Sequence, residues 1–244
     1  VVILFYNFFN NKNNMLIFII LSSLFFYAYF KLKYVFIIIL SITINYYIIN
    51  LIWKNNKKIF LTGGILFNIS ILIFFKYTDF FIYNYNIILD QNIRFMNIAL
   101  PLAISFFTFQ QIGFMIEAYF KNVKKINFLR YFAFITFFPQ LIAGPILNYK
   151  ELLPELKKNI KRKLKYKNIV LGLIIFTVGL FKKVIIADNF AIYVDNIFDS
   201  AFENKPYSSI YYLIGMLCFS FQIYFDFSAY SDMAVGIAKV LGFN

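Results

Sequence analysis

The 244-residue chain contains no histidine, and this absence removes the side chain that most often serves as a general base near neutral pH. A serine or cysteine nucleophile would have no histidine of this chain to activate it. The single cysteine, Cys218, stands in an apolar run, so a disulfide framework is excluded. The sequence also lacks a glycine-rich phosphate loop and the HExxH, CxxC and GxSxG motifs, and we predict no metal site.

Charged residues are also scarce, at 14% of the chain, whereas 61% of the residues are hydrophobic and 23% are aromatic. A mean hydropathy of +0.72 is too apolar for a single soluble core, because large apolar patches would remain exposed. The composition therefore predicts an all-α integral membrane protein, a multi-pass helical bundle.

Hydropathy predicts the membrane spans, since a helical crossing needs about 20 mainly apolar residues. A last segment, from Tyr207 to Leu241, is long enough for a crossing plus a break or a second helix. Residues 1–9 resemble the end of an earlier span, and no signal-peptide pattern is present. The other predicted spans are Met15–Phe30, Tyr34–Trp53, Ile59–Tyr77, Phe95–Phe120 and Ile169–Ala187.

Basic residues gather in three connections, which the positive-inside rule places in the cytoplasm. The intervening connections carry acidic residues, including Asp79, Asp90, Asp188 and Glu203, and are predicted to be external. The net charge of +13 is thus explained by topology, and we predict no nucleic-acid partner. The basic connections hold Lys54, Lys57 and Lys58; Lys121, Lys124, Lys125 and Arg130; and the residues from Lys150 to Lys167.

The apolar segment from Tyr131 to Leu147 lies between two basic connections, so it must enter and leave on the same side. Two full spans do not fit there, and a re-entrant element does. Pro139 and Pro145 would break the helix and Gly144 would allow a tight bend. An ordinary kinked span is the alternative. The basic stretch that follows is either an amphipathic helix on the cytoplasmic leaflet, a solvated loop, or a docking surface for an acidic carrier protein or a coenzyme phosphate.

The last apolar segment carries polar residues that need an explanation. Gln222, Asp226 and Tyr230 follow one another at i, i+4 spacing and share one helix face, and Ser228 with Asp232 forms a second such pair. A carboxylate at bilayer depth costs roughly 2.5 kcal/mol or more unless it is paired or hydrated. Either these side chains line an internal cavity for a polar substrate, or they clamp two helices together.

Polar residues in the other apolar segments give further candidates. Gln110 is deep enough in its segment to line such a cavity, and Glu117 is predicted near the cytoplasmic interface. Lys182 and Lys183 are interpreted as lysines whose side chains reach toward the membrane surface. These residues leave an intramembrane enzyme and a transporter for a polar or lipid-linked substrate as alternatives, although no inverted repeat supports the transporter.

Four stretches resemble one family: LPLAISFFTFQQIGFMIEAYF, FITFFPQLIAGPILNYKE, GLFKKVIIADN and FSFQIYFDFSAYSDMAVGIAKVLGF. They are similar to the membrane-bound O-acyltransferases, in the bacterial branch of alginate O-acetylation, peptidoglycan O-acetylation and teichoic acid D-alanylation proteins. The resemblance implies a single transmembrane domain over residues 1–244, truncated at both ends. It also implies a location in a bacterial cytoplasmic (inner) membrane.

The resemblance further implies transfer of an acyl group, such as acetyl, through a funnel to hydroxyls of an extracytoplasmic polysaccharide, for example an alginate-like exopolysaccharide or peptidoglycan. No cofactor is expected to stay bound. The acyl donor, acetyl-CoA or an acyl carrier protein, would come from the cytoplasm, and the other expected partners are membrane lipids and the glycan or a partner acetyltransferase. The candidate funnel-lining residues are Gln110, Gln140, Gln222, Asp226, Tyr230, Ser231 and Asp232.

The resemblance also bears on catalysis. Gln140 or Tyr230 could stabilise the tetrahedral oxyanion. The family's catalytic histidine lies in a motif resembling EFWRRWHIS, which would follow Asn244, so no catalytic residue is assigned within this chain. We therefore expect the isolated chain to be inactive.

Overall fold

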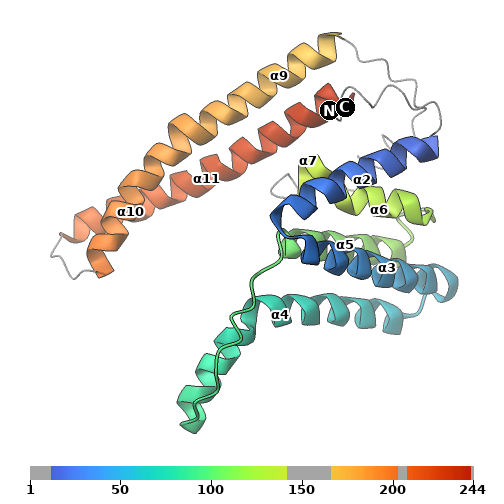
Figure 1. Ribbon diagram of the computed structural model, residues 1–244, viewed down its shortest axis with the longest axis horizontal. Coiled ribbons are helices and arrows are strands. Elements are labelled where there is room, and N and C mark those ends of the chain that lie inside the picture. The colour runs from blue at the N-terminus through green and yellow to red at the C-terminus, as the bar shows by residue number, and fades with distance from the viewer. Residues whose placement is uncertain (1–11, 142–165, 203–207, 243–244) are drawn as a thin grey trace. The chain divides into compact units, whose positions relative to one another are not determined.

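The computed structural model describes residues 12–141, 166–202 and 208–242, and these described residues are helical apart from their connections (Figure 1). They divide into two compact units, one with the helices up to residue 141 and the other with those from residue 166 onward. Among the described residues, four helices are long and apolar enough to cross a membrane. They are Leu32–Asn55, Lys58–Leu89, Tyr166–Ser200 and Ser209–Val240. The prediction of an all-α integral membrane protein is confirmed.

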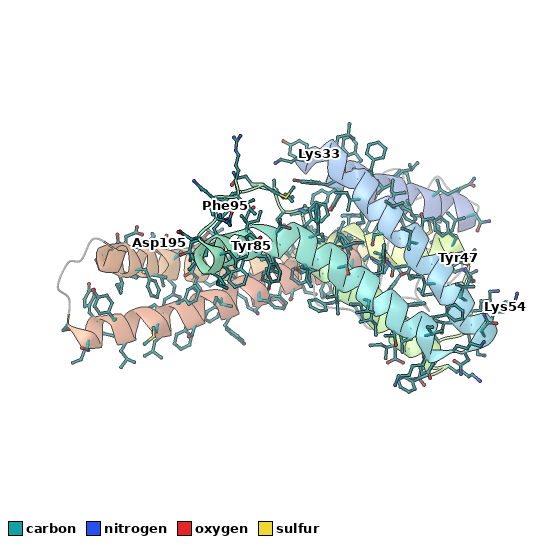
Figure 2. All side chains as sticks on the ribbon, turned by 90° about the horizontal axis from the view of Figure 1, so that it is seen from below. Lys33, Tyr47, Lys54, Tyr85, Phe95 and Asp195 are labelled. Carbon is teal, nitrogen blue, oxygen red and sulfur yellow. The ribbon has the colours of Figure 1, made fainter. Side chains whose placement is uncertain are left out.

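The first unit begins with three helices that overlap the first three predicted spans: α2 (Lys12–Phe30), α3 (Leu32–Asn55) and α4 (Lys58–Leu89). The third span was predicted too short, because α4 continues 12 residues beyond Tyr77, and Asp79, predicted in an external connection, lies within it. Its core follows one stripe of α3, where isoleucines recur at helical spacing and are fully buried. These are Ile38, Ile42, Ile49 and Ile52. Lys33 and Lys54 mark the two ends of α3 in Figure 2. After Asn56, which has a left-handed backbone (φ 46°), the chain turns back into α4.

The fourth predicted span is wrong in its first part, because residues 90–103 are not helical and α5 covers only Ile104–Tyr119. This returning segment runs back beside the end of α4 (Figure 1). The Asp79 carboxylate accepts hydrogen bonds from the backbone N–H groups of Met96 (2.8 Å) and Asn97 (3.1 Å). Asn86 likewise exchanges two hydrogen bonds with the backbone of Ile93 (2.8 and 2.9 Å). Side chains of α4 thus provide hydrogen bonds to backbone groups of this non-helical segment, which in a helix would bond to one another.

The predicted re-entrant segment begins with two short helices, α6 (Phe128–Thr136) and α7 (Phe138–Leu141). The helix breaks at Phe137, and Pro139 stands in the first turn of α7, where a missing N–H is tolerated. The last six residues of α6, from Tyr131 to Thr136, are buried inside the unit. Gly144 and Pro145 lie outside the described residues, so the re-entrant path remains a prediction.

The second unit is a helical hairpin. α9 (Tyr166–Phe181), the π-helical stretch η1 (Lys182–Ala187) and α10 (Asp188–Phe202) continue into one another, and they pack antiparallel against α11 (Ser209–Val240) (Figure 1). The predicted span ending at Ala187 is therefore too short, because the helix continues for a further 15 residues as α10. Asp188, Asp195 and Asp199, predicted in an external connection, lie within α10. The break predicted between Tyr207 and Leu241 is also wrong, because α11 is continuous over 32 residues.

Candidate functional site

The two arms of the hairpin approach closely because glycines face each other across it. A Cβ atom added to Gly172 would lie 2.6 Å from the carbonyl oxygen of Gly236, and one added to Gly236 would lie 2.7 Å from the oxygen of Gly172. Further along, a Cβ on Gly179 would meet the oxygen of Ala229 at 2.7 Å. Small residues at such positions are typical of membrane helix pairs. We call these four residues the glycine seam.

Directly beyond the glycine seam, both lysines of the π-helical stretch reach across to α11. Lys182 Nζ lies 2.6 Å from Asp232 Oδ2 and donates to Ser228 Oγ at 3.0 Å. Lys183 Nζ lies 2.7 Å from Asp226 Oδ1 and 2.7 Å from Asp188 Oδ1. Asp226 and Asp232 are six residues apart on α11, so the two ammonium groups contact this helix at points about 9 Å apart along its axis. The three lysine–carboxylate contacts and the bond to Ser228 define the mid-hairpin charge cluster: Lys182, Lys183, Asp188, Asp226, Ser228 and Asp232.

The cluster lies near the middle of both arms. At 1.5 Å per residue, Lys183 is about 26 Å along the axis from Tyr166 and about 29 Å from Phe202. Asp226 is likewise about 26 Å from Ser209 and about 21 Å from Val240. Charges so far from either helix end are expensive in a bilayer unless paired, and here each one has a partner. The interpretation that the lysines simply reach toward the surface is therefore wrong.

The structure places the predicted residues of α11 in different surroundings. Asp226 and Asp232 belong to the charge cluster, and their side chains keep exposed fractions of 28% and 33%. Gln222 is half-buried, and its buried Oε1 atom accepts no hydrogen bond within the described chain. Tyr230 is exposed and Ser231 is half-buried. The two acids therefore pair with different lysines of the π-helical stretch, whereas Tyr230 stands on the outside of the hairpin.

The remaining candidates belong to the first unit. Gln110 is buried in α5, and its Nε2 donates to the carbonyl oxygen of Phe134 in α6 at 3.3 Å. Pro139 is half-buried in α7. Gln140 lies in the same short helix, but its side chain is outside the described part of the structure. No described contact shows whether these residues line a funnel.

The first unit also contains a buried polar network that sequence reasoning missed. Asn45 of α3 and Asn68 of α4 exchange hydrogen bonds between their side-chain amides, at 2.6 and 3.2 Å. Ser41 Oγ accepts from both Asn45 (3.3 Å) and Gln111 (3.0 Å), and Tyr131 of α6 donates to Gln111 Oε1 at 3.3 Å. This amide network links four helices.

A sequence signal for the lysine pairs did exist. Lys182 and Lys183 interrupt an apolar run, and the last helix carries two acids in a similarly apolar setting. Matching numbers of opposite charges in neighbouring membrane segments predict pairing. The signal was missed because the span was predicted to end at Ala187, which put the lysines near a membrane surface. The sequence signal for the amide network was weaker, because an isolated amide in an apolar helix does not identify its partner. This applies to Asn45, Asn68 and Gln111.

Comparison with known proteins gives a consistent result. The model of the MBOAT, or membrane-bound O-acyltransferase, family matches residues 5–244. The chain is 42% identical over 245 aligned positions to a peptidoglycan O-acetyltransferase of Helicobacter pylori, covering 88% of this chain and 46% of the relative. It is 31% identical to a probable alginate O-acetylase AlgI of Pseudomonas aeruginosa, covering 91% and 44%. It is 26% identical to a teichoic acid D-alanyltransferase of Bacillus subtilis, covering 60% and 36%.

Proposed function

Because the chain belongs to the membrane-bound O-acyltransferase family, we propose that its complete gene product transfers an acyl group, acetyl in the first instance, to hydroxyls of an extracytoplasmic polysaccharide. The chain spans about half the length of the curated relatives it matches, so the activity is proposed for the whole protein. Peptidoglycan is the favoured acceptor, because the relative that carries this name shares 42% of the aligned residues. An alginate-like exopolysaccharide is the second candidate, supported by the 31% identical relative.

The observation that carries this proposal is the mid-hairpin charge cluster. Five ionisable side chains near the middle of two candidate spans form a polar site inside the membrane. Ionisable residues at that depth mark substrate pathways more often than simple anchors. A reaction that moves an acyl group from one side of a bilayer to a hydroxyl on the other needs such an internal polar site. A soluble transferase would have no use for it.

The proposed route starts in the cytoplasm of a bacterium and crosses its inner membrane. The acyl donor is acetyl-CoA or an acyl carrier protein, and the basic residues from Lys150 to Lys167 supply attractive charge for either one. The acceptor is the extracytoplasmic glycan or a partner acetyltransferase that passes the group on. Membrane lipids surround the spans, and no nucleic acid is involved.

The residues of this chain would bind and orient the reactants. Gln222, Asp226 and Asp232 stand on the helix that carries the cluster, and Gln110 and Gln140 belong to the elements around the predicted re-entrant segment. The chain has no histidine, so it cannot by itself provide the imidazole base that the family resemblance implies. Proton removal from the acceptor hydroxyl is therefore assigned to a residue outside the 244 positions.

The test is complementation. The complete gene product would be expressed in a bacterium that lacks its own peptidoglycan O-acetyltransferase, and the acetate released from purified peptidoglycan by mild alkali would be measured. We expect O-acetylation to return, and to return equally with Ser220→Ala, because the Ser220 hydroxyl bonds only to its own helix at Met216. A stably inserted protein that acetylates neither peptidoglycan nor exopolysaccharide would contradict the proposal.

A further inference from the structure

The two lysines of the charge cluster have unused hydrogen-bonding capacity. An ammonium group carries three donors. Lys182 uses two of them, on Asp232 and Ser228, and Lys183 forms ion pairs with Asp188 and Asp226. Both side chains are 28% exposed, so a third N–H on each one can be reached from outside the helix pair. The cluster therefore offers donors to a ligand that brings an acceptor oxygen.

A complementary acceptor stands one helical turn away. The Oε1 atom of Gln222 is buried and accepts no hydrogen bond within the described residues. A buried carbonyl without a donor costs free energy of order 1–3 kcal/mol, so its retention calls for an explanation. Gln222 precedes Asp226 by four residues, which places the two side chains on the same face of α11. A group bound there would contact Lys183 through an acceptor and Gln222 through a donor.

The charge of the cluster decides between ligand classes. Two ammonium groups face three carboxylates, which leaves a net charge of −1 among the paired side chains. A phosphate or carboxylate ligand would meet this excess negative charge in a medium of low dielectric constant, where repulsion is strong. An uncharged hydroxyl avoids the repulsion and is both donor and acceptor.

We propose that Gln222 and Lys183, with the rest of the mid-hairpin charge cluster, bind an uncharged hydroxyl group of a sugar. The inference rests on the proposed function, because it makes this site the place where the acceptor glycan enters. Gln222 Oε1 accepts the hydroxyl proton in a hydrogen bond, and Lys183 donates to the hydroxyl oxygen. The carboxylates hold the ammonium groups in place and exclude anionic ligands, so the phosphates of an acyl donor bind elsewhere.

The experiment measures sugar binding rather than acetyl transfer. The complete gene product in lipid nanodiscs would be titrated with N-acetylglucosamine and, separately, with N-acetylglucosamine 6-phosphate, using saturation-transfer NMR or calorimetry. We expect the neutral sugar to bind about tenfold or more tightly than the phosphorylated one. Asp188→Asn should reduce this preference, because it brings the net charge of the cluster to zero. Equal or tighter binding of the phosphorylated sugar to the unmodified protein would overturn the proposal.

The variants separate binding from structural support. Gln222→Leu should weaken binding of the neutral sugar by about three- to tenfold without lowering the melting temperature, because it removes an acceptor that has no hydrogen-bond partner among the described residues. Ser220→Ala, two residues earlier on α11, is the matched control and should leave the Kd unchanged. A Gln222→Leu protein that binds the sugar as tightly as the unmodified protein would refute the site. Sugar binding that persists without acetyl transfer would count against the proposed function alone.

Discussion

Lys182 and Lys183 determine how the carboxylates of α11 are accommodated far from either helix end. Each ammonium lies within 2.7 Å of a carboxylate oxygen of α11, so neither Asp226 nor Asp232 is an isolated charge. Lys183 is shared with Asp188, which means that removing Asp226 leaves the lysine with one partner. The two acids therefore have a structural role beside the functional one that we propose, and a substitution must separate the two.

Two substitutions, Asp226→Asn and Asp226→Leu, separate the structural role of Asp226 from its proposed functional role. The amide keeps the size and one hydrogen bond to Lys183, so we expect Asp226→Asn to insert normally while glycan acetylation falls about 10- to 100-fold through misplacement of the bound group. Asp226→Leu should in addition lower stability by about 1–3 kcal/mol, because Lys183 then loses its acceptor on α11 and keeps only Asp188. Membrane abundance, melting temperature and O-acetylation would be compared. A stable and fully active Asp226→Asn protein would remove this residue from the site.

The helix pair of the second unit depends on the glycine seam. Gly236 and Gly172 place their backbones in contact, and this short interhelical distance allows the lysines of η1 to reach α11. A π-helical stretch at this point shifts the angular position of the residues that follow it, and such stretches are frequent at functional sites. Packing and charge pairing are thus coupled within one element.

Gly236→Ala tests the seam. A Cβ atom would meet the Gly172 oxygen at 2.7 Å and the Phe176 nitrogen at 2.8 Å, so the helices must separate, and we expect a loss of stability of about 1–3 kcal/mol. Gly63→Ala in α4 is the control, because nothing lies within 4 Å of its added Cβ, and alanine favours a helix by about 1 kcal/mol. Thermal unfolding in detergent measures both. An unchanged melting temperature for Gly236→Ala would show that the seam is not tightly packed.

The amide network of the first unit allows a test by paired substitution. Asn68→Leu leaves the Asn45 amide without its partner in a buried position, and we expect a loss of about 1–3 kcal/mol. The double change Asn45→Leu with Asn68→Leu should recover much of that loss, since both polar groups are then absent. Asn84→Leu, at an exposed hydrogen bond of the same helix, should change little. Equal stability of the single and double variants would contradict pairwise coupling.

Across the whole molecule, the arrangement of spans follows the positions of the basic connections. The described helices α3 and α4 meet at Lys54 and Lys58, and the connection after α5 carries Lys121 and Lys124. Helix α6 starts close behind that connection and is too short to cross a bilayer, with 9 residues. The return of the chain to the side from which it came stays a prediction, because it depends on residues after 141.

Cysteine labelling checks this topology. After Cys218 is replaced by alanine, single cysteines would be placed at Lys124, Lys158 and Glu203 and treated with a membrane-impermeant maleimide on intact cells and on inverted vesicles. We expect positions 124 and 158 to react from the cytoplasmic side and position 203 from the opposite side, by the positive-inside rule. Opposite reactivity of positions 124 and 158 would rule out the re-entrant element.

The sequence by itself determined the membrane class, the helical fold and the approximate places of four long helices, because these follow from local composition and hydropathy. The family resemblance came from contiguous motifs in the same way. Only the tertiary structure decided that Lys182 and Lys183 pair with α11, that Asn45 meets Asn68, and that residues 90–103 return along α4 as an extended segment. These contacts depend on which helix faces which and in what register. That choice is made by glycines and side-chain acceptors far apart along the chain, and local sequence patterns do not encode it.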